Sequence, residues 1–311
     1  MYCIKDNSIV NKIMFAPSSS SYDKNLGVFW IDDSCCLFIK YAAGQAIILT
    51  QHTDIEPRPV VIICHGNACD IGHMENFGKL LCESCQCHVI LYEYPGYGLS
   101  SGIPSENSCV DRLSNVINHL NQQMDIPIQN MIFYGQSIGS GIAAVGYKYC
   151  KTTFGQSPAG LVLISPYLSI KTLGQDIVST CVPILDRLET RENIKYCETG
   201  LLIMHGDKDN VIPVNHGKEL DDIAKCHVKM LDIMIGIGHN DIPYDRIINN
   251  FRVMLGHISS DMLYENMTYR NNICWDDRSN YEQVELNSIS TTMATCVEAT
   301  SASTMSLCVM F

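Results

Sequence analysis

The sequence predicts an α/β fold in which a mostly parallel central sheet begins with antiparallel strands and carries helices on both faces. Short apolar runs alternate with longer helix-like stretches from residue 28 to about residue 257. The first three runs follow one another closely, as hairpin-linked strands do, whereas later runs are separated by the dozen or more residues that a crossover helix needs. The expected strands are residues 28–32, 37–41, 46–51, 60–64, 88–93, 131–135, 161–165, 201–205 and 229–233.

One helix can be delimited closely. Residues 105–123 place apolar side chains on a single stripe, with Ser105 as a candidate N-cap and Pro127 beyond the end. The stripe consists of Val110, Leu113, Val116, Ile117 and Leu120.

The chain is expected to form one α/β domain over residues 1–257 and a tail over residues 258–311. Residues 166–200 are too long for a simple loop and have a mixed helical pattern, so we expect a small lid-like insert there. The tail is rich in Ser, Thr, Asn and Met and holds seven acidic residues against two arginines. That composition is typical of an acidic, disordered segment.

Composition excludes several classes of protein. With 46% hydrophobic and 17% charged residues, the 311-residue chain can build a sizeable core. Its 21 basic and 33 acidic residues give a net charge of −12, which argues against nucleic acid as a partner. The longest apolar runs fall below the ~18 residues that suggest a membrane span. Charges near the N-terminus interrupt any signal peptide, so we expect a cytoplasmic protein.

The sixteen cysteines are read chiefly as free thiols, because the cytosol is reducing. Most, such as Cys64, are interpreted as small buried hydrophobic residues or surface thiols. The group at residues 82–87 has the C-x-x-C spacing of half a zinc site, but the sequence holds no second pair of matching ligands. A structural role for these cysteines is favoured over zinc binding. The sequence implies neither a metal nor an organic cofactor.

A candidate nucleophile lies in the G-x-S-x-G pentad at residues 135–139, whose serine is Ser137. The pentad follows the expected strand 131–135 and precedes a run of small helix-forming residues. This strand, tight turn and helix form a nucleophile elbow, in which glycines leave room for a sharp turn that lifts the serine clear of the sheet.

A serine hydroxyl needs a histidine base, which in turn needs an orienting acid, in the chain order Ser, Asp, His. Asp209 follows the expected strand 201–205, and Asp207 on the same loop is a rival acid. His239 follows the last expected strand and has a glycine on one side. Taken singly, Asp209 is typical of a solvated turn and His239 of a helix cap. Their joint placement indicates a catalytic triad of Ser137, Asp209 and His239.

The turn after strand 60–64 is the place from which this architecture donates a backbone N–H to an oxyanion. The expected donors are the N–H groups of Asn67 and Ile138. A phosphate-binding role for the same turn is excluded, because the glycine spacings of the known phosphate loops are missing.

These segments resemble the α/β-hydrolase superfamily, and within it the α/β-hydrolase domain-containing protein 17 group, over about residues 12–256. The shared words are HGNACDIG at 65–72, YEYPGYGLSSG at 92–102, YGQSIGSG at 134–141 and GHND at 238–241. The resemblance implies the α/β-hydrolase fold, serine hydrolase activity that removes palmitate from protein cysteines, and the triad named above. The loop at residues 94–102 is read either as lining the acyl entrance or as a simple structural turn.

Members of this group usually carry several N-terminal cysteines whose palmitoylation holds them on membranes, whereas here Cys3 stands alone near the start. The last four residues read as C-a-a-X with Phe at the end, a form that directs prenylation of Cys308 or arises by accident. One prenyl group binds membranes only marginally, so acylation of Cys296 or Cys3 is the expected second signal. The expectation is a peripheral protein on the cytosolic face of a membrane.

Three functions stay open at this point. The first is hydrolysis of acyl thioesters on S-acylated proteins through an acyl-serine intermediate. The second is a carboxylesterase that acts on lipids or small esters with the same residues. The third is a catalytically silent, membrane-associated binding module.

Overall fold

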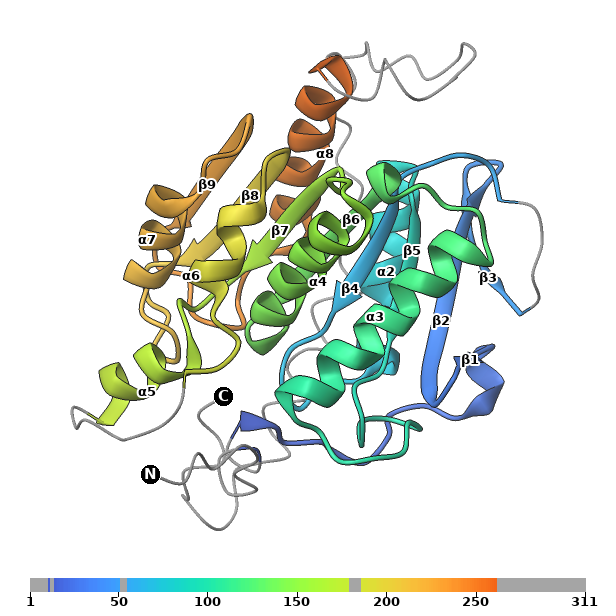
Figure 1. Ribbon diagram of the computed structural model, residues 1–311, viewed down its shortest axis with the longest axis horizontal. Coiled ribbons are helices and arrows are strands. Elements are labelled where there is room, and N and C mark those ends of the chain that lie inside the picture. The colour runs from blue at the N-terminus through green and yellow to red at the C-terminus, as the bar shows by residue number, and fades with distance from the viewer. Residues whose placement is uncertain (1–10, 12–13, 51–54, 179–185, 262–311) are drawn as a thin grey trace.

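The computed structural model describes residues 11, 14–50, 55–178 and 186–261 of the 311. Within these residues a sheet has the strand order β1-β2-β5-β4-β6-β7-β8-β9, with β3 paired to β2 (Figure 1). The strands are β1 (Phe29–Ile31), β2 (Ser34–Ala42), β3 (Gln45–Leu49), β4 (Val60–Cys64), β5 (His88–Tyr92), β6 (Met131–Gln136), β7 (Gly160–Ile164), β8 (Gly200–Gly206) and β9 (Val228–Met234).

The pairing confirms the predicted strand directions. β2 runs antiparallel to β1, β3 and β5, while every neighbouring pair from β5 through β4, β6, β7 and β8 to β9 is parallel. The carboxyl ends of these parallel strands therefore meet at one edge of the sheet, and the loops that follow them lie together.

Helices cover both faces of the sheet. Figure 1 shows α3 and α4 across the near face and α2 and α8 behind it. The helices are α2 (Ile71–Cys85), α3 (Glu106–Gln122), α4 (Ile138–Phe154), α5 (Ile170–Val178), α6 (Thr190–Asn193), α7 (Asn215–Ile223) and α8 (Tyr244–Asp261), with short 3-10 turns η1 (Lys24–Leu26), η2 (Ile128–Asn130) and η3 (Ile194–Tyr196).

The central strands are apolar on both sides because each face packs against a helical layer. In β4, for example, Ile62 belongs to the core under α3 and α4, whereas Val61 and Ile63 belong to the core under α2 and α8. The side chain of Ser105 caps α3 by accepting a hydrogen bond from Ser108 N at 3.1 Å, as its sequence position predicts.

The expected insert and tail are only partly described. The described part of residues 166–200 contains α5, α6 and η3. Residues 262–311 lie outside the described part of the chain, and α8 continues through the expected boundary at residue 257 to Asp261.

The described residues bear on two expectations from the sequence, which concern the cysteine group at residues 82–87 and membrane-spanning segments. Cys82, Cys85 and Cys87 are buried in the core under α2, and no cluster of three or more candidate metal ligands occurs in the described segments. Among the helices that the structure describes, none combines the length and the apolar character needed to cross a bilayer.

Candidate active site

Ser137 stands between the end of β6 and the start of α4 with φ of 52° and ψ of −121°. Such a backbone conformation costs ~1–3 kcal/mol for a non-glycine residue and is retained only where the surroundings enforce it. A Cβ at Gly135 would collide with the Gly139 carbonyl oxygen, and a Cβ at Gly139 would collide with the Cys64 carbonyl oxygen. Both glycines of the pentad are therefore required for the turn, and Ser137 sits at its apex.

The structure brings Ser137, His239 and Asp209 together from three loops at the carboxyl edge. His239 Nε2 lies 3.0 Å from Ser137 Oγ, and His239 Nδ1 lies 2.7 Å from Asp209 Oδ2. Each of the three residues is at most 9% exposed. The rival acid, Asp207, instead accepts a hydrogen bond from Gly236 N at 2.6 Å and so braces the loop that leads to His239.

The Asp209 carboxylate is held by both of its oxygens. Its Oδ1 accepts hydrogen bonds from the N–H groups of Val211 at 2.9 Å and Ile212 at 2.7 Å. Burial alone would raise the pKa of Asp209, but hydrogen bonds from His205 and His239 outweigh it and hold that pKa well below its usual range. The carboxylate is consequently ionised at neutral pH and can fix the orientation of the His239 ring.

His205 is a site residue that sequence reasoning treated only as the end of a strand. Its ring is fully buried, with Nε2 at 2.9 Å from the Ile212 carbonyl oxygen and 3.3 Å from Asp209 Oδ2. The only signal in the sequence is its position four residues before Asp209, which does not show which way the ring points.

The predicted oxyanion donors belong to the two turns that meet at Ser137. Ile138 is the first residue of α4, where a backbone N–H has no acceptor within the helix. Asn67 follows Gly66, whose position against the nucleophile is close: a Cβ built there would lie 4.0 Å from Ser137 Cβ. The Asn67 side chain is engaged elsewhere, because its Oδ1 accepts from Tyr97 OH at 2.7 Å and from Ala16 N at 2.9 Å.

An apolar crevice opens next to Ser137. Besides Ser137 it is lined by Ile138, Tyr167, Ile170, Leu173, Val211 and Ile212. Two of these come from α5, at the same end of the molecule as the start of α4 (Figure 1). The lining is apolar, as a hydrocarbon chain requires, but the enclosed volume is only about 10 Å³, so an acyl chain on Ser137 needs the lining side chains to move apart.

The loop at residues 94–102 contributes no residue to the lining of this crevice. Tyr94 and Tyr97 are fully buried, and their rings lie 4.0 Å and 5.4 Å from the ring of His65. Tyr94 OH also donates to the His65 carbonyl oxygen at 2.8 Å. The loop supports the turn at Gly66, because the rings of Tyr94 and Tyr97 pack against His65 in that turn.

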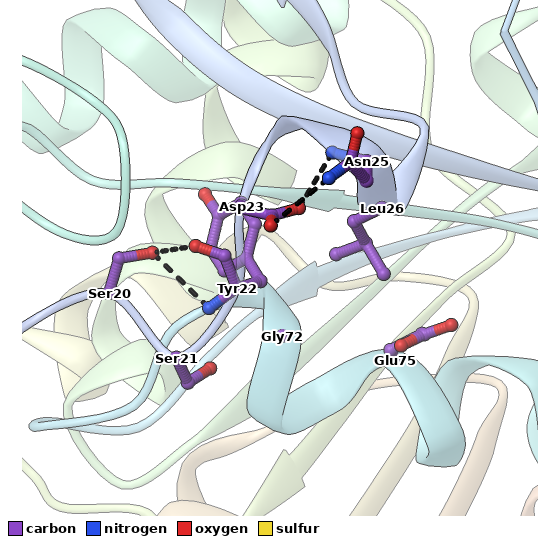
Figure 2. Close-up of a pocket in the computed structure, with 8 residues that line it drawn as sticks. All are labelled: Ser20, Ser21, Tyr22, Asp23, Asn25, Leu26, Gly72 and Glu75. Carbon is purple, nitrogen blue, oxygen red and sulfur yellow. Dashed lines mark hydrogen bonds between the residues drawn. The ribbon is translucent and has the colours of Figure 1, made fainter.

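A wider hollow lies at the N-terminal segment that precedes β1 and at the first turns of α2 (Figure 2). Its lining is polar and consists of Ser20, Ser21, Tyr22, Asp23, Asn25, Leu26, Gly72 and Glu75. None of these residues belongs to the group around Ser137. The candidate lipidation sites Cys3, Cys296 and Cys308 lie outside the described residues.

Comparisons with known proteins agree with this fold. Residues 55–195 match the family model described as serine aminopeptidase, S33. The chain is 34% identical over 204 residues to an α/β hydrolase of Acanthamoeba polyphaga mimivirus, with 65% of this chain and 74% of the relative covered. It is 30% identical over 255 residues to the α/β-hydrolase domain-containing protein aho-3 of Caenorhabditis elegans, with 76% and 74% covered.

The chain is also similar to one further relative and to one solved structure. Human α/β-hydrolase domain-containing protein 17C is 29% identical over 225 residues, with 71% of this chain and 62% of the relative covered. The structure of a Butyrivibrio proteoclasticus protein with bound ferulic acid superposes with a TM-score of 0.59 at 12% identity, covering 75% of this chain and 99% of that one. By its relatives and its fold, this chain belongs to the α/β-hydrolase family.

Proposed function

We propose that this protein is a serine hydrolase that cleaves acyl thioesters from S-acylated protein cysteines through an acyl-Ser137 intermediate. The observation that carries the proposal is the 3.0 Å approach of His239 Nε2 to Ser137 Oγ, with Asp209 on the other ring nitrogen and an apolar crevice alongside. The resemblance to the α/β-hydrolase domain-containing protein 17 group supports a long-chain acyl thioester as the substrate.

In the first half-reaction Ser137 Oγ attacks the acyl carbonyl carbon while its proton passes to His239 Nε2. The carbonyl oxygen becomes negative and is stabilised by the N–H groups of Asn67 and Ile138. When the tetrahedral intermediate collapses, the carbon–sulfur bond breaks. The substrate cysteine leaves as a thiol with the proton that His239 returns.

In the second half-reaction water attacks the acyl-serine ester and gives one proton to His239. Collapse of this second intermediate breaks the bond to Ser137 Oγ, which takes the proton back, and the fatty acid is released. Asp209 stays ionised throughout, because its low pKa makes it an acceptor for the Nδ1 proton of His239 and not a proton store.

The same residues would hydrolyse an oxyester, so the substrate class must be measured. The experiment compares steady-state turnover of a long-chain acyl thioester and its matched oxyester by the purified protein and by Ser137→Ala. Preference for the thioester, lost in Ser137→Ala, is the expected result. Preference for the oxyester would replace the proposal with a lipid or small-ester esterase, and no Ser137-dependent turnover of either would leave only a binding module.

A further inference from the structure

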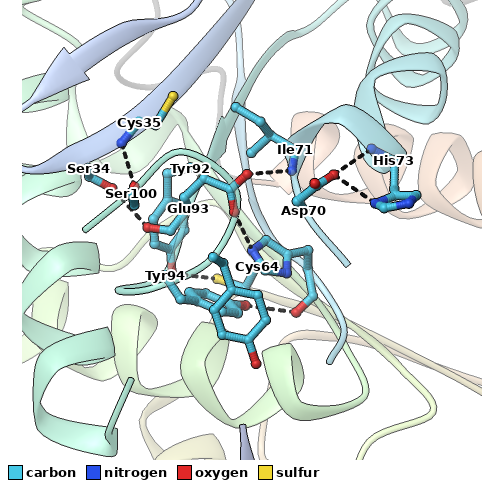
Figure 3. A network of polar contacts seen from close by, with 12 residues as sticks. Ser34, Cys35, Cys64, Asp70, Ile71, His73, Tyr92, Glu93, Tyr94 and Ser100 are labelled. Atoms are coloured by element: carbon cyan, nitrogen blue, oxygen red, sulfur yellow. Dashed lines mark hydrogen bonds and ion pairs between the residues drawn. The ribbon is translucent and has the colours of Figure 1, made fainter. Parts of the chain in front are cut away.

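Two of the sequence motifs near the site, residues 65–72 and 92–102, contact each other through a buried pair of ionisable side chains. His65 Nε2 lies 3.3 Å from Glu93 Oε2, and the side chains are 1% and 0% exposed. Figure 3 shows the Glu93 carboxylate reaching toward Ile71, the first residue of α2. Neither residue takes part in the reaction steps above, and burying a carboxylate this deeply is costly unless it is paired and hydrogen-bonded.

His65 controls the direction of one peptide group. His65 Nδ1 lies 2.9 Å from the Gly66 carbonyl oxygen, and since a carbonyl only accepts, Nδ1 must donate. The Gly66 carbonyl and the Asn67 N–H belong to the same planar trans peptide, so they point in opposite directions. Holding the carbonyl on His65 therefore turns the Asn67 N–H to the other side, and Gly66 itself lies against Ser137.

Glu93 in turn is rigidly placed. Its Oε1 accepts hydrogen bonds from Ile71 N at 2.8 Å and from Tyr22 OH at 2.9 Å, which leaves Oε2 to face the imidazole. Space for this carboxylate depends on Gly98, where a Cβ would collide with Glu93 Oε1. The His65 ring is also fixed on its flank by the ring of Tyr94 at 4.0 Å.

We propose that Glu93 and His65 are positioning residues for the oxyanion-binding peptide: Glu93 fixes the His65 ring, and His65 aims the Asn67 N–H at the carbonyl oxygen of the reacting acyl group. This inference rests on the proposed function, since it assumes a tetrahedral intermediate on Ser137. It assigns to the 92–102 loop a role in the transition state rather than in substrate binding.

The informative variant is His65→Phe, which keeps an aromatic ring beside Tyr94 but removes the Nδ1 donor that holds the Gly66 carbonyl. Glu93→Gln would not test the contact, because its amide N–H can donate to His65 Nε2 and so keeps the proton on Nδ1. Loss of one oxyanion donor typically lowers kcat by 10²–10³, and misdirecting a donor that is still present should lower it by about tenfold or more. The KM should change little, because the donor acts on charge that develops only in the transition state.

The test uses the full-length protein, an activated short-chain ester as substrate and a trifluoromethyl ketone, which forms a tetrahedral adduct with the serine, as inhibitor. Active sites are counted with a fluorophosphonate, so that kcat refers to folded enzyme only. For His65→Phe, kcat per active site should fall while the inhibition constant of the ketone rises by a similar factor. A purely structural role would instead reduce the number of active sites and leave both constants unchanged.

Asp70→Asn is the control. Asp70 is 1% exposed, caps α2 by accepting from His73 N at 3.0 Å, and is a buried polar residue in the same region. Asparagine is an equally good N-cap, so this variant should keep kcat and ketone inhibition. The inference is overturned if His65→Phe matches the wild type, or if both variants lose kcat equally. A wild type that turns over no ester would instead overturn the proposed function.

Discussion

His205 Nε2 lies 3.3 Å from Asp209 Oδ2, the same carboxylate oxygen that meets His239 Nδ1 at 2.7 Å. Two imidazoles therefore converge on one buried oxygen, while the other oxygen is held by backbone N–H groups of the following turn. This arrangement keeps the carboxylate ionised and still, which is the property that a triad acid needs.

Asp209→Asn tests this role against its rival on the same loop. An amide at this position can present an N–H to His239 and favours the wrong tautomer of the imidazole, a change that lowers kcat on the order of 10⁴ in serine proteases. We expect a comparable loss here. Asp207→Asn, the control, should keep kcat within about tenfold, because Asp207 contacts Gly236 N and not His239. Equal losses in the two variants would contradict the assignment of the acid.

Gly139→Ala tests whether the sharp turn is needed. The added methyl group would collide with the Cys64 carbonyl oxygen, so we expect destabilisation by about 1–3 kcal/mol together with loss of activity. Gly256→Ala in α8 is the control, because no atom beyond the neighbouring backbone of its own helix lies within 4 Å of the added Cβ. Alanine is also favoured over glycine in helices by roughly 0.5–1 kcal/mol. Urea unfolding of both variants measures the difference. A stable and active Gly139→Ala protein would disprove the account of the elbow.

Filling the crevice should change selectivity for acyl length. Leu173 lies in α5 and lines the crevice, so Leu173→Phe should lower kcat/KM for a long-chain acyl thioester more than for an acetyl thioester. Val253→Phe, at an exposed position of α8, is the control and should leave the ratio of the two substrates unchanged. A uniform loss for both chain lengths in Leu173→Phe would show that the crevice does not hold the acyl chain.

The contact between His73 and Asp70 predicts a pH dependence of stability. Its 2.7 Å approach to Asp70 raises the pKa of His73, despite partial burial, above the ~6.5 expected in the unfolded chain. A raised folded-state pKa stabilises the protein fully below the unfolded pKa, and this stabilisation is lost as the pH rises through the folded pKa. The free energy of unfolding that His73 contributes should therefore fall as the pH increases above about 6.5.

Urea unfolding of the wild type and of His73→Gln on both sides of that pH isolates this contribution. Burial lowers the pKa values of His88 and His216, which gives the opposite dependence in both proteins and cancels in the difference. The variant should be less stable than the wild type at acid pH, and the gap should narrow at alkaline pH. A gap that is constant or widens with pH would refute the prediction.

Much of the fold was predictable because the parallel strands β4, β5, β6, β7 and β8 are buried on both faces and so appear as continuous apolar runs. The meeting of Ser137, Asp209 and His239 followed from the same reasoning, since loops after parallel strands share one edge. The sequence favoured Asp209 but left Asp207 as a rival, because both follow β8 within three residues. The direction of each side chain separates them, and only the structure shows it.

Other features depend on contacts between distant segments. The part played by Tyr94 and Glu93 was hidden because their partner, His65, lies 28 and more residues earlier and no local pattern links the two loops. The second imidazole on Asp209 was likewise hidden, since His205 reads as the end of a buried strand.

The central claim is that Ser137 carries the acyl group during turnover. The most direct measurement is rapid acid quenching of the protein during reaction with a long-chain acyl thioester, followed by peptide mapping with and without neutral hydroxylamine. The account predicts an acyl group on the peptide that contains Ser137, as a hydroxylamine-resistant oxyester that is missing in Ser137→Ala. Turnover with the acyl group on a hydroxylamine-sensitive cysteine, or persisting in Ser137→Ala, would contradict it.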